Sequence, residues 1–131
     1  MEQDESRKLG NFGEKIACKH LENKGYKILG RNYSKILDCK LRGEIDIIAE
    51  KDKIVRFIEV KSQKTPGRAG SFLPEDRVDS RKKKQLLKLA QFWLAENNFP
   101  CDSGWQIDVI SVKIDFENKK AKIRHFENAV F

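Results

Sequence analysis

The chain has 131 residues, of which 39% are hydrophobic and 36% are charged, and its formal net charge is +7 at pH 7. This length and apolar content fit a single folded domain over residues 1–131 and exclude a wholly disordered chain. Three cysteines without a CxxC spacing exclude a disulfide framework and indicate a reducing compartment. The sequence predicts neither a signal peptide nor a membrane span, so we expect a cytoplasmic protein that does not bind membranes.

The first half of the chain predicts a helix, a short strand and a β-hairpin. Apolar residues recur at helical spacing in the first segment, and Gly25 follows it as a C-terminal cap. Two later runs rich in Ile and Val are separated by a tight polar turn, as in a hairpin. The predicted elements are a helix over 6–24, a strand over 26–33, a polar loop over 34–42, and strands over 43–50 and 54–62.

The second half predicts a long loop, a second helix and two further strands. Residues 63–78 contain two prolines and two glycines and predict a loop, and the helix begins near Asp79 or Ser80 and ends before Pro100. The last strands are predicted over 105–114 and 121–129. Asp108 stands among apolar neighbours there, and we expect it to form a structural ion pair. The order αβββαββ predicts an α/β domain with a central mixed sheet flanked by helices.

The predicted hairpin carries ionisable side chains among its apolar residues. Glu44 and Asp46 share one face of the first strand, and Glu59 and Lys61 share one face of the second, with Phe57. A two-residue turn would place Asp46 opposite Glu59, and Glu44 opposite Lys61. Two carboxylates about 5 Å apart repel by roughly 3 kcal/mol at an effective dielectric constant near 20, so something must offset the repulsion.

A shared proton, an ion pair with Lys61 and a divalent cation are three ways to offset this repulsion. Mg²⁺ suits carboxylate oxygens and leaves coordination positions for water and phosphate. The plainer interpretation is a solvent-exposed hairpin face, where acids and lysines are ordinary. The nearly continuous apolar runs IDIIA and IVRFIEV oppose it, because such runs are typical of strands covered on both faces, where unused charges are costly.

The positive charge is concentrated in one part of the chain. Residues 61–88 contain nine lysines and arginines and three acids. Such a patch predicts an anionic partner, and nucleic acid, DNA first, is the leading candidate. Positive side chains at the start of the second helix oppose its dipole, which favours a phosphate bound there over a merely solvated turn. The predicted phosphate-binding residues are Arg68, Arg81, Lys82, Lys83 and Lys84.

At the hairpin the sequence resembles the restriction-endonuclease-like nuclease superfamily, whose signature is an acid, a spacer and then (D/E)-x-K. The matching residues are Asp46 and, after the spacer, Glu59-Val60-Lys61. Over nearly its whole length the chain also resembles the YraN family, small bacterial proteins related to archaeal Holliday-junction resolvases. The matching segments are GEKIACKHLENKGYKILGRNY (13–33), GEIDIIA (43–49), FIEVKSQ (57–63), VDSRKKKQLLKLAQFWL (78–94), IDVISV (107–112) and HFENAVF (125–131).

This resemblance implies a restriction-endonuclease-like fold and hydrolysis of phosphodiesters with Mg²⁺ or Mn²⁺. Glu14 matches an acid that resolvase relatives place near the metal. Gln63 stands where such families often carry an arginine, a difference that bears on phosphate contacts and not on the metal. The resemblance implies two sets of site residues. The metal ligands would be Asp46, Glu59 and the main-chain carbonyl of Val60, and the catalytic residues would be Lys61, Glu14 and Glu44.

Three functions therefore compete. The leading hypothesis is a metal-dependent nuclease that acts on branched or otherwise structured DNA. The second is a non-catalytic nucleic-acid-binding module with the same fold. The third is a protein–protein scaffold, such as a homodimer formed through a sheet edge. The intact set of Asp46, Glu59 and Lys61 favours the first over the second, and the basic patch favours the first two over the third.

Overall fold

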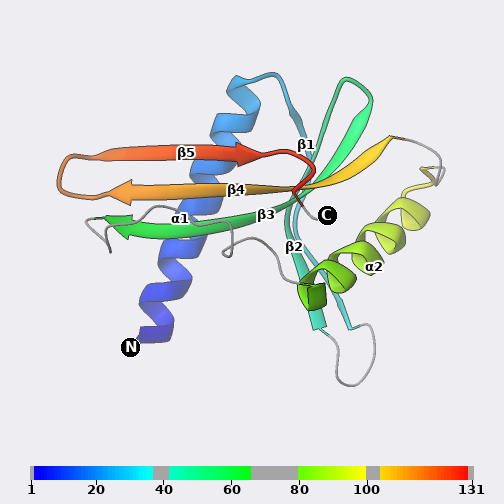
Figure 1. Ribbon diagram of the computed structural model, residues 1–131, viewed down its shortest axis with the longest axis horizontal. Helices are drawn as coiled ribbons and strands as arrows, with labels where there is room; N and C mark the ends of the chain where they lie inside the picture. Colours follow the sequence, from blue (N-terminus) through cyan, green and yellow to red (C-terminus); the bar gives the residue numbers. More distant parts are fainter. Residues whose placement is uncertain (1, 37–41, 66–79, 100–103, 130–131) are drawn as a thin grey trace.

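The computed structural model of the chain describes residues 2–36, 42–65, 80–99 and 104–129 (Figure 1). Its helices are α1 (Glu2–Asn23) and α2 (Ser80–Glu96). Its strands are β1 (Lys27–Ile36), β2 (Arg42–Lys51), β3 (Ile54–Thr65), β4 (Trp105–Asp115) and β5 (Lys120–Phe126). Neither of the described helices is long and apolar enough to cross a membrane.

The strands form one open, mixed sheet in the order β1-β2-β3-β4-β5. β3 and β4 are parallel, and the other neighbouring pairs are antiparallel. Parallel neighbours need a crossover connection, and the chain between β3 and β4 contains α2. This architecture confirms the predicted α/β class, with a central mixed sheet flanked by helices.

The two helices cover the two faces of the sheet. α1 buries Ala17 and Leu21 in a cluster that includes Ile58 of β3, on what we call the α1 face. α2 buries Leu89 in a second cluster that includes Phe57 of β3, on what we call the α2 face. Neighbouring residues of β3 therefore lie in different cores, as in a strand that is covered on both sides. Figure 1 shows α1 crossing the sheet and α2 lying beside β2.

Three predicted strand ends are wrong, because pairing with a neighbouring strand decides where each strand stops. β1 continues to Ile36 through residues predicted as a loop, since Ser34 and Lys35 pair with β2. β3 continues to Thr65, since residues 63–65 pair with the end of parallel β4. The last strand ends at Phe126 and not at 129.

Asp108 of β4 is fully buried and forms the structural ion pair that its apolar neighbours predicted. Its Oδ2 lies 2.7 Å from Nε2 of His125 and 3.9 Å from Nη1 of Arg56. The backbone N–H of Asn128 donates a hydrogen bond to Oδ1 at 2.8 Å, and Arg56 also pairs with Glu127. These contacts tie the segment after β5 to the sheet and give the described part of HFENAVF a structural role.

α1 and β3 approach most closely where Gly13 meets Ser62. A Cβ atom at position 13 would lie 1.8 Å from Oγ and 2.8 Å from Cβ of Ser62. Gly13→Ala is therefore expected to lower the free energy of unfolding by about 1–3 kcal/mol, as overpacking does. Gly10→Ala is the matched control in the same helix, because no side chain of the described residues beyond its chain neighbours lies within 4 Å of the added methyl group.

Gly10→Ala should raise the free energy of unfolding by up to about 1 kcal/mol, through helix propensity alone. Urea unfolding of both variants measures the difference. Adding Ser62→Gly to Gly13→Ala should recover most of the lost stability, because it removes both atoms that clash. Equal stabilisation by the two alanines would show that the α1–β3 contact is not tight.

Candidate functional site

The β2–β3 hairpin has the register that a two-residue turn predicts. Asp52 and Lys53 have φ values of 54° and 66°, and positive φ at both central residues is typical of a type I′ turn. The paired positions run from Lys51 and Ile54 to Ile47 and Ile58. The four ionisable residues that were predicted to meet lie just beyond this paired stretch.

β2 departs from regular pleating at Asp46. Ile45 packs on the α2 face and Ile47 on the α1 face, although residues two apart in a regular strand share a face. Asp46 is consequently not a ladder partner of Glu59. Its Oδ2 instead accepts a hydrogen bond from the backbone N–H of Val60 at 2.7 Å. The predicted register is therefore wrong beyond the pair Ile47 and Ile58, because β2 turns at Asp46.

Three carboxylates gather at this turn. Glu14 of α1 and Glu44 and Asp46 of β2 each place one carboxylate oxygen within 4.8 Å of the other two. We call these three residues the acidic cluster. Glu14 is buried, with 9% of its surface exposed, and its Oε1 lies 3.6 Å from Nη2 of Arg31. The structure thus brings an acid of the first helix beside two acids of the second strand.

Asn32 of β1 joins two of these carboxylates and was not singled out from the sequence. With its side-chain nitrogen turned toward them, it donates hydrogen bonds to Oε1 of Glu44 at 2.8 Å and to Oε1 of Glu14 at 2.9 Å. Its φ of 53° is left-handed, a conformation that Asn tolerates better than most residues. The sequence indication for Asn32 was its position in GRNY (30–33), within the segment 13–33 that resembles the YraN family.

Glu59 approaches the acidic cluster from the other face of the sheet. Residues alternate regularly along β3, so Glu59 and Lys61 lie on the α2 face with Phe57, and Val60 packs against the α1 core. Oε2 of Glu59 lies 3.7 Å from Nζ of Lys82 on α2. Glu59 is not a member of the compact acidic cluster, but the charge of Asp46 contributes to its raised pKa.

Burial and mutual repulsion raise the pKa values of these acids. Burial, and next the charge of Asp46, raise the pKa of Glu59 to about 7, against the pull of Lys82 and Lys61. Burial raises the pKa of Asp46 to about 6, although the Val60 N–H stabilises its charged form. The pKa of Glu14 is also raised, first by burial and then by its two acidic neighbours. The site therefore concentrates negative charge that the fold does not neutralise well.

A divalent cation fits this arrangement of side chains. Oε2 of Glu59 is buried and has no hydrogen-bond partner among the residues that the structure describes. Buried polar atoms usually have a partner, so an unsatisfied carboxylate oxygen beside other acids is typical of an ion site. Mg²⁺ and Mn²⁺ take oxygen ligands of this kind. The residues that could hold such an ion are Asp46, Glu59, Glu14 and Glu44.

The basic residues at the start of α2 lie beside this site to different degrees. Lys82 is half-buried and faces Glu59, so it belongs to the electrostatics of the site itself. Arg81 and Lys84 are exposed, and Lys83 is half-buried. Their contact with phosphates stays a prediction. Arg68, in the predicted loop, lies outside the described residues.

An open mixed sheet with a helix on each face is consistent with a restriction-endonuclease-like α/β protein. The model of the uncharacterised protein family UPF0102 matches residues 13–112. The chain therefore belongs to the UPF0102 family, which is the YraN family that the sequence resembled.

Relatives in this family are similar over almost their entire length. The UPF0102 protein of Desulforamulus reducens is 40% identical over 123 residues, covering 93% of this chain and 94% of the relative. The UPF0102 protein of Caldanaerobacter subterraneus subsp. tengcongensis is 37% identical over 130 residues, covering 98% and 99%. That of Geobacter metallireducens is 40% identical over 124 residues, covering 95% and 93%.

Proposed function

We propose that this protein is a metal-dependent nuclease that hydrolyses phosphodiester bonds in branched or otherwise structured DNA. One observation carries the proposal: four acids and two lysines lie close together where β2 turns away from β3. Three of the acids, Glu14, Asp46 and Glu59, are at least partly buried and carry raised pKa values, which a fold tolerates when the charge is used. The residues are Glu14, Glu44, Asp46, Glu59, Lys61 and Lys82.

Asp46 and Glu59 would hold Mg²⁺ or Mn²⁺, with Glu14 and Glu44 on the side of α1. When bound, the ion supplies positive charge that activates water for attack and neutralises the scissile phosphate. The hydrogen bond from Val60 N–H holds the Asp46 carboxylate in place. Asn32 does the same for Glu14 and Glu44. Such fixed ligand positions reduce the reorganisation needed at the moment of reaction.

Lys61 would stabilise the charge that develops on the phosphate oxygens in the transition state. It lies on the same face of β3 as Glu59 and lowers the pKa of that carboxyl group. Arg81, Lys82 and the lysines that follow them would bind neighbouring phosphates at the start of α2. The net charge of +7 suits a polyanionic substrate and predicts binding that weakens steeply with salt.

A cleavage assay on labelled single strands, duplexes, flaps and four-way junctions, with Mg²⁺ or Mn²⁺, tests this proposal. Lys61→Met is expected to lower the cleavage rate on the preferred substrate by about 10²–10³-fold, the size of effect seen when one transition-state-stabilising group is lost. Lys122→Met, an exposed lysine of β5, is the matched control and should leave the rate unchanged.

The substrate that is cleaved identifies the DNA structure on which the protein acts. Binding without cleavage, unaffected by Lys61→Met, would overturn the nuclease proposal in favour of a DNA-binding module. If the protein binds none of these nucleic acids at low salt, both the nuclease and the DNA-binding module are overturned, and a protein–protein scaffold is favoured.

A further inference from the structure

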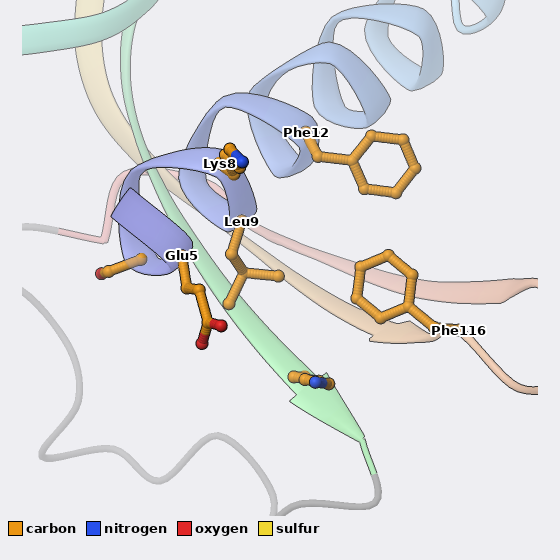
Figure 2. A pocket seen from close by; sticks show the side chains of 7 residues that line it. Glu5, Lys8, Leu9, Phe12 and Phe116 are labelled. Carbon is orange, nitrogen blue, oxygen red and sulfur yellow. The ribbon is translucent and has the colours of Figure 1, made fainter. Parts of the chain in front are cut away.

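A second surface feature lies along the first half of α1, the helix that also carries Glu14. A groove of about 560 Å³ runs between the first half of α1 and the ends of β3 and β4 (Figure 2). Its lining includes Leu9 and Phe12 of α1, Lys64 of β3 and Phe116, which follows β4. None of these residues has a role in the chemistry proposed above.

The groove displays two aromatic rings to solvent. Phe12 and Phe116 stack with their centroids 5.8 Å apart and 22° between their planes. They nevertheless stay 45% and 48% exposed, which is unusual for rings that have found a partner. Nζ of Lys64 lies 5.9 Å from the centre of the Phe116 ring. The pair therefore offers a flat apolar face with a cation beside it.

Positive charge surrounds the ring pair on both sides. Phe12 and Phe116 also line a smaller hollow of about 210 Å³. Residues of the turn between β4 and β5 form another part of its lining. Asp115 in this hollow accepts hydrogen bonds from Asn118, which lower its pKa and keep it charged, so it offsets part of the positive charge around the rings. The charged residues that line the two hollows are the lysines Lys8, Lys64, Lys119 and Lys120 and the acids Glu5 and Asp115.

The groove and the acidic site share two elements of the fold, α1 and β3. Phe12 and Glu14 lie in the same turn of α1, and Gly13 between them packs against Ser62 of β3. Lys64 follows two residues later on the same face of the strand. Lys61 and Lys64 are about 10 Å apart along β3 but lie on opposite faces of the sheet.

We propose that this groove binds an unpaired nucleotide of the DNA substrate, with its base stacked on the Phe12–Phe116 pair and its phosphates held by the surrounding lysines. Aromatic rings flanked by cations are the means by which proteins bind single-stranded nucleic acid without sequence preference. A second copy of this chain fits less well, because it would bring two lysine-rich surfaces together. The inference rests on the proposed function and narrows its substrate to DNA that carries an unpaired segment.

The test measures the affinity of the full-length protein for a labelled oligothymidylate and for a blunt duplex of equal length, in EDTA. Phe116→Ala is expected to weaken oligothymidylate binding by about 10-fold and to leave duplex affinity unchanged. Phe116→Trp should restore the affinity, because it returns a stacking surface.

Phe92→Ala is the matched control. Phe92 on α2 is also 45% exposed and also carries a lysine, Lys35, 5.7 Å from its ring centre. It has no stacked ring partner among the described residues, and its loss should leave both affinities unchanged. Equal losses from Phe116→Ala and Phe92→Ala, or no loss from either, would overturn the inference. A wild-type dimer that Phe116→Ala dissociates in sedimentation would also overturn it, in favour of a second copy.

Binding in EDTA does not depend on cleavage, so the two proposals fail separately. Selective loss of single-strand binding in a protein that cleaves no substrate would support the groove and overturn the nuclease. If the wild-type protein cleaves DNA and Phe116→Ala binds single strands as tightly as the wild type, the nuclease proposal is supported and the groove proposal is overturned.

Discussion

Saturating Mg²⁺ at pH 8 is expected to raise the melting temperature of the wild-type protein by on the order of 10 °C. A ligand at about 100 times its dissociation constant adds about 2.7 kcal/mol to the free energy of unfolding when it binds only the folded state. For a domain of this size each kcal/mol moves the melting temperature by several degrees. The physical source is the acidic cluster and Glu59, whose repulsion the ion would neutralise.

Asp46→Asn is expected to remove most of this shift. The asparagine keeps an oxygen that can accept the hydrogen bond of Val60 N–H, but it removes the negative charge. Asp52→Asn is the control, because it makes the same chemical change in the exposed turn of the same hairpin and should leave the full shift. Differential scanning calorimetry measures all three proteins. Equal shifts in the wild type and Asp46→Asn, or none in either, would exclude an ion site at these acids.

Without metal, the protein is expected to lose stability as the pH rises from about 4 to about 7. Glu59 and Asp46 have folded-state pKa values of about 7 and about 6, above their ordinary values of 4.5 and 3.8. Between the ordinary and the raised values the folded state binds more protons than the unfolded state, so the free energy of unfolding falls with pH. Each pKa unit corresponds to about 1.4 kcal/mol, so the two acids together should contribute several kcal/mol, on the order of 6 kcal/mol at most because part of each shift comes from the other acid.

Glu59→Gln separates this effect from the titration of other groups. The glutamine cannot ionise, so the variant should be more stable than the wild type at pH 8 and lose that advantage at pH 5. Glu117→Gln, in the exposed turn after β4, should differ from the wild type by the same small amount at both values of pH. Urea unfolding in EDTA at several pH values measures the three curves. A wild-type curve that rises from pH 5 to pH 8 in parallel with that of Glu59→Gln would contradict the raised pKa.

The two effects are linked through the same carboxyl groups. Protons and Mg²⁺ both neutralise the site, and they compete for it. The thermal shift with Mg²⁺ should therefore be largest near pH 8 and small at pH 5. The same shift at both values of pH would indicate that the ion binds elsewhere.

Much of the fold could be predicted from the sequence, because it depends on residues that are close together in the chain. Apolar spacing within 6–24 predicted α1, and the two-residue turn at Asp52 and Lys53 predicted the hairpin and its register as far as Ile47 and Ile58. The apolar neighbours of Asp108 in β4 predicted that it would be buried with a charged partner. Each of these conclusions required only local periodicity or turn chemistry.

The sequence by itself determined the α/β class and the hairpin, since these depend on short-range spacing, and its resemblance to the YraN family indicated the residues of the candidate chemistry. Only the tertiary structure decided that Glu14 meets Asp46, that Asn32 joins the carboxylates and that Phe12 stacks on Phe116. Those contacts connect segments that are far apart in the chain, and their geometry depends on how α1 packs on the sheet and where β2 turns. Local patterns carry no information about either, because both are set by the packing of the whole core.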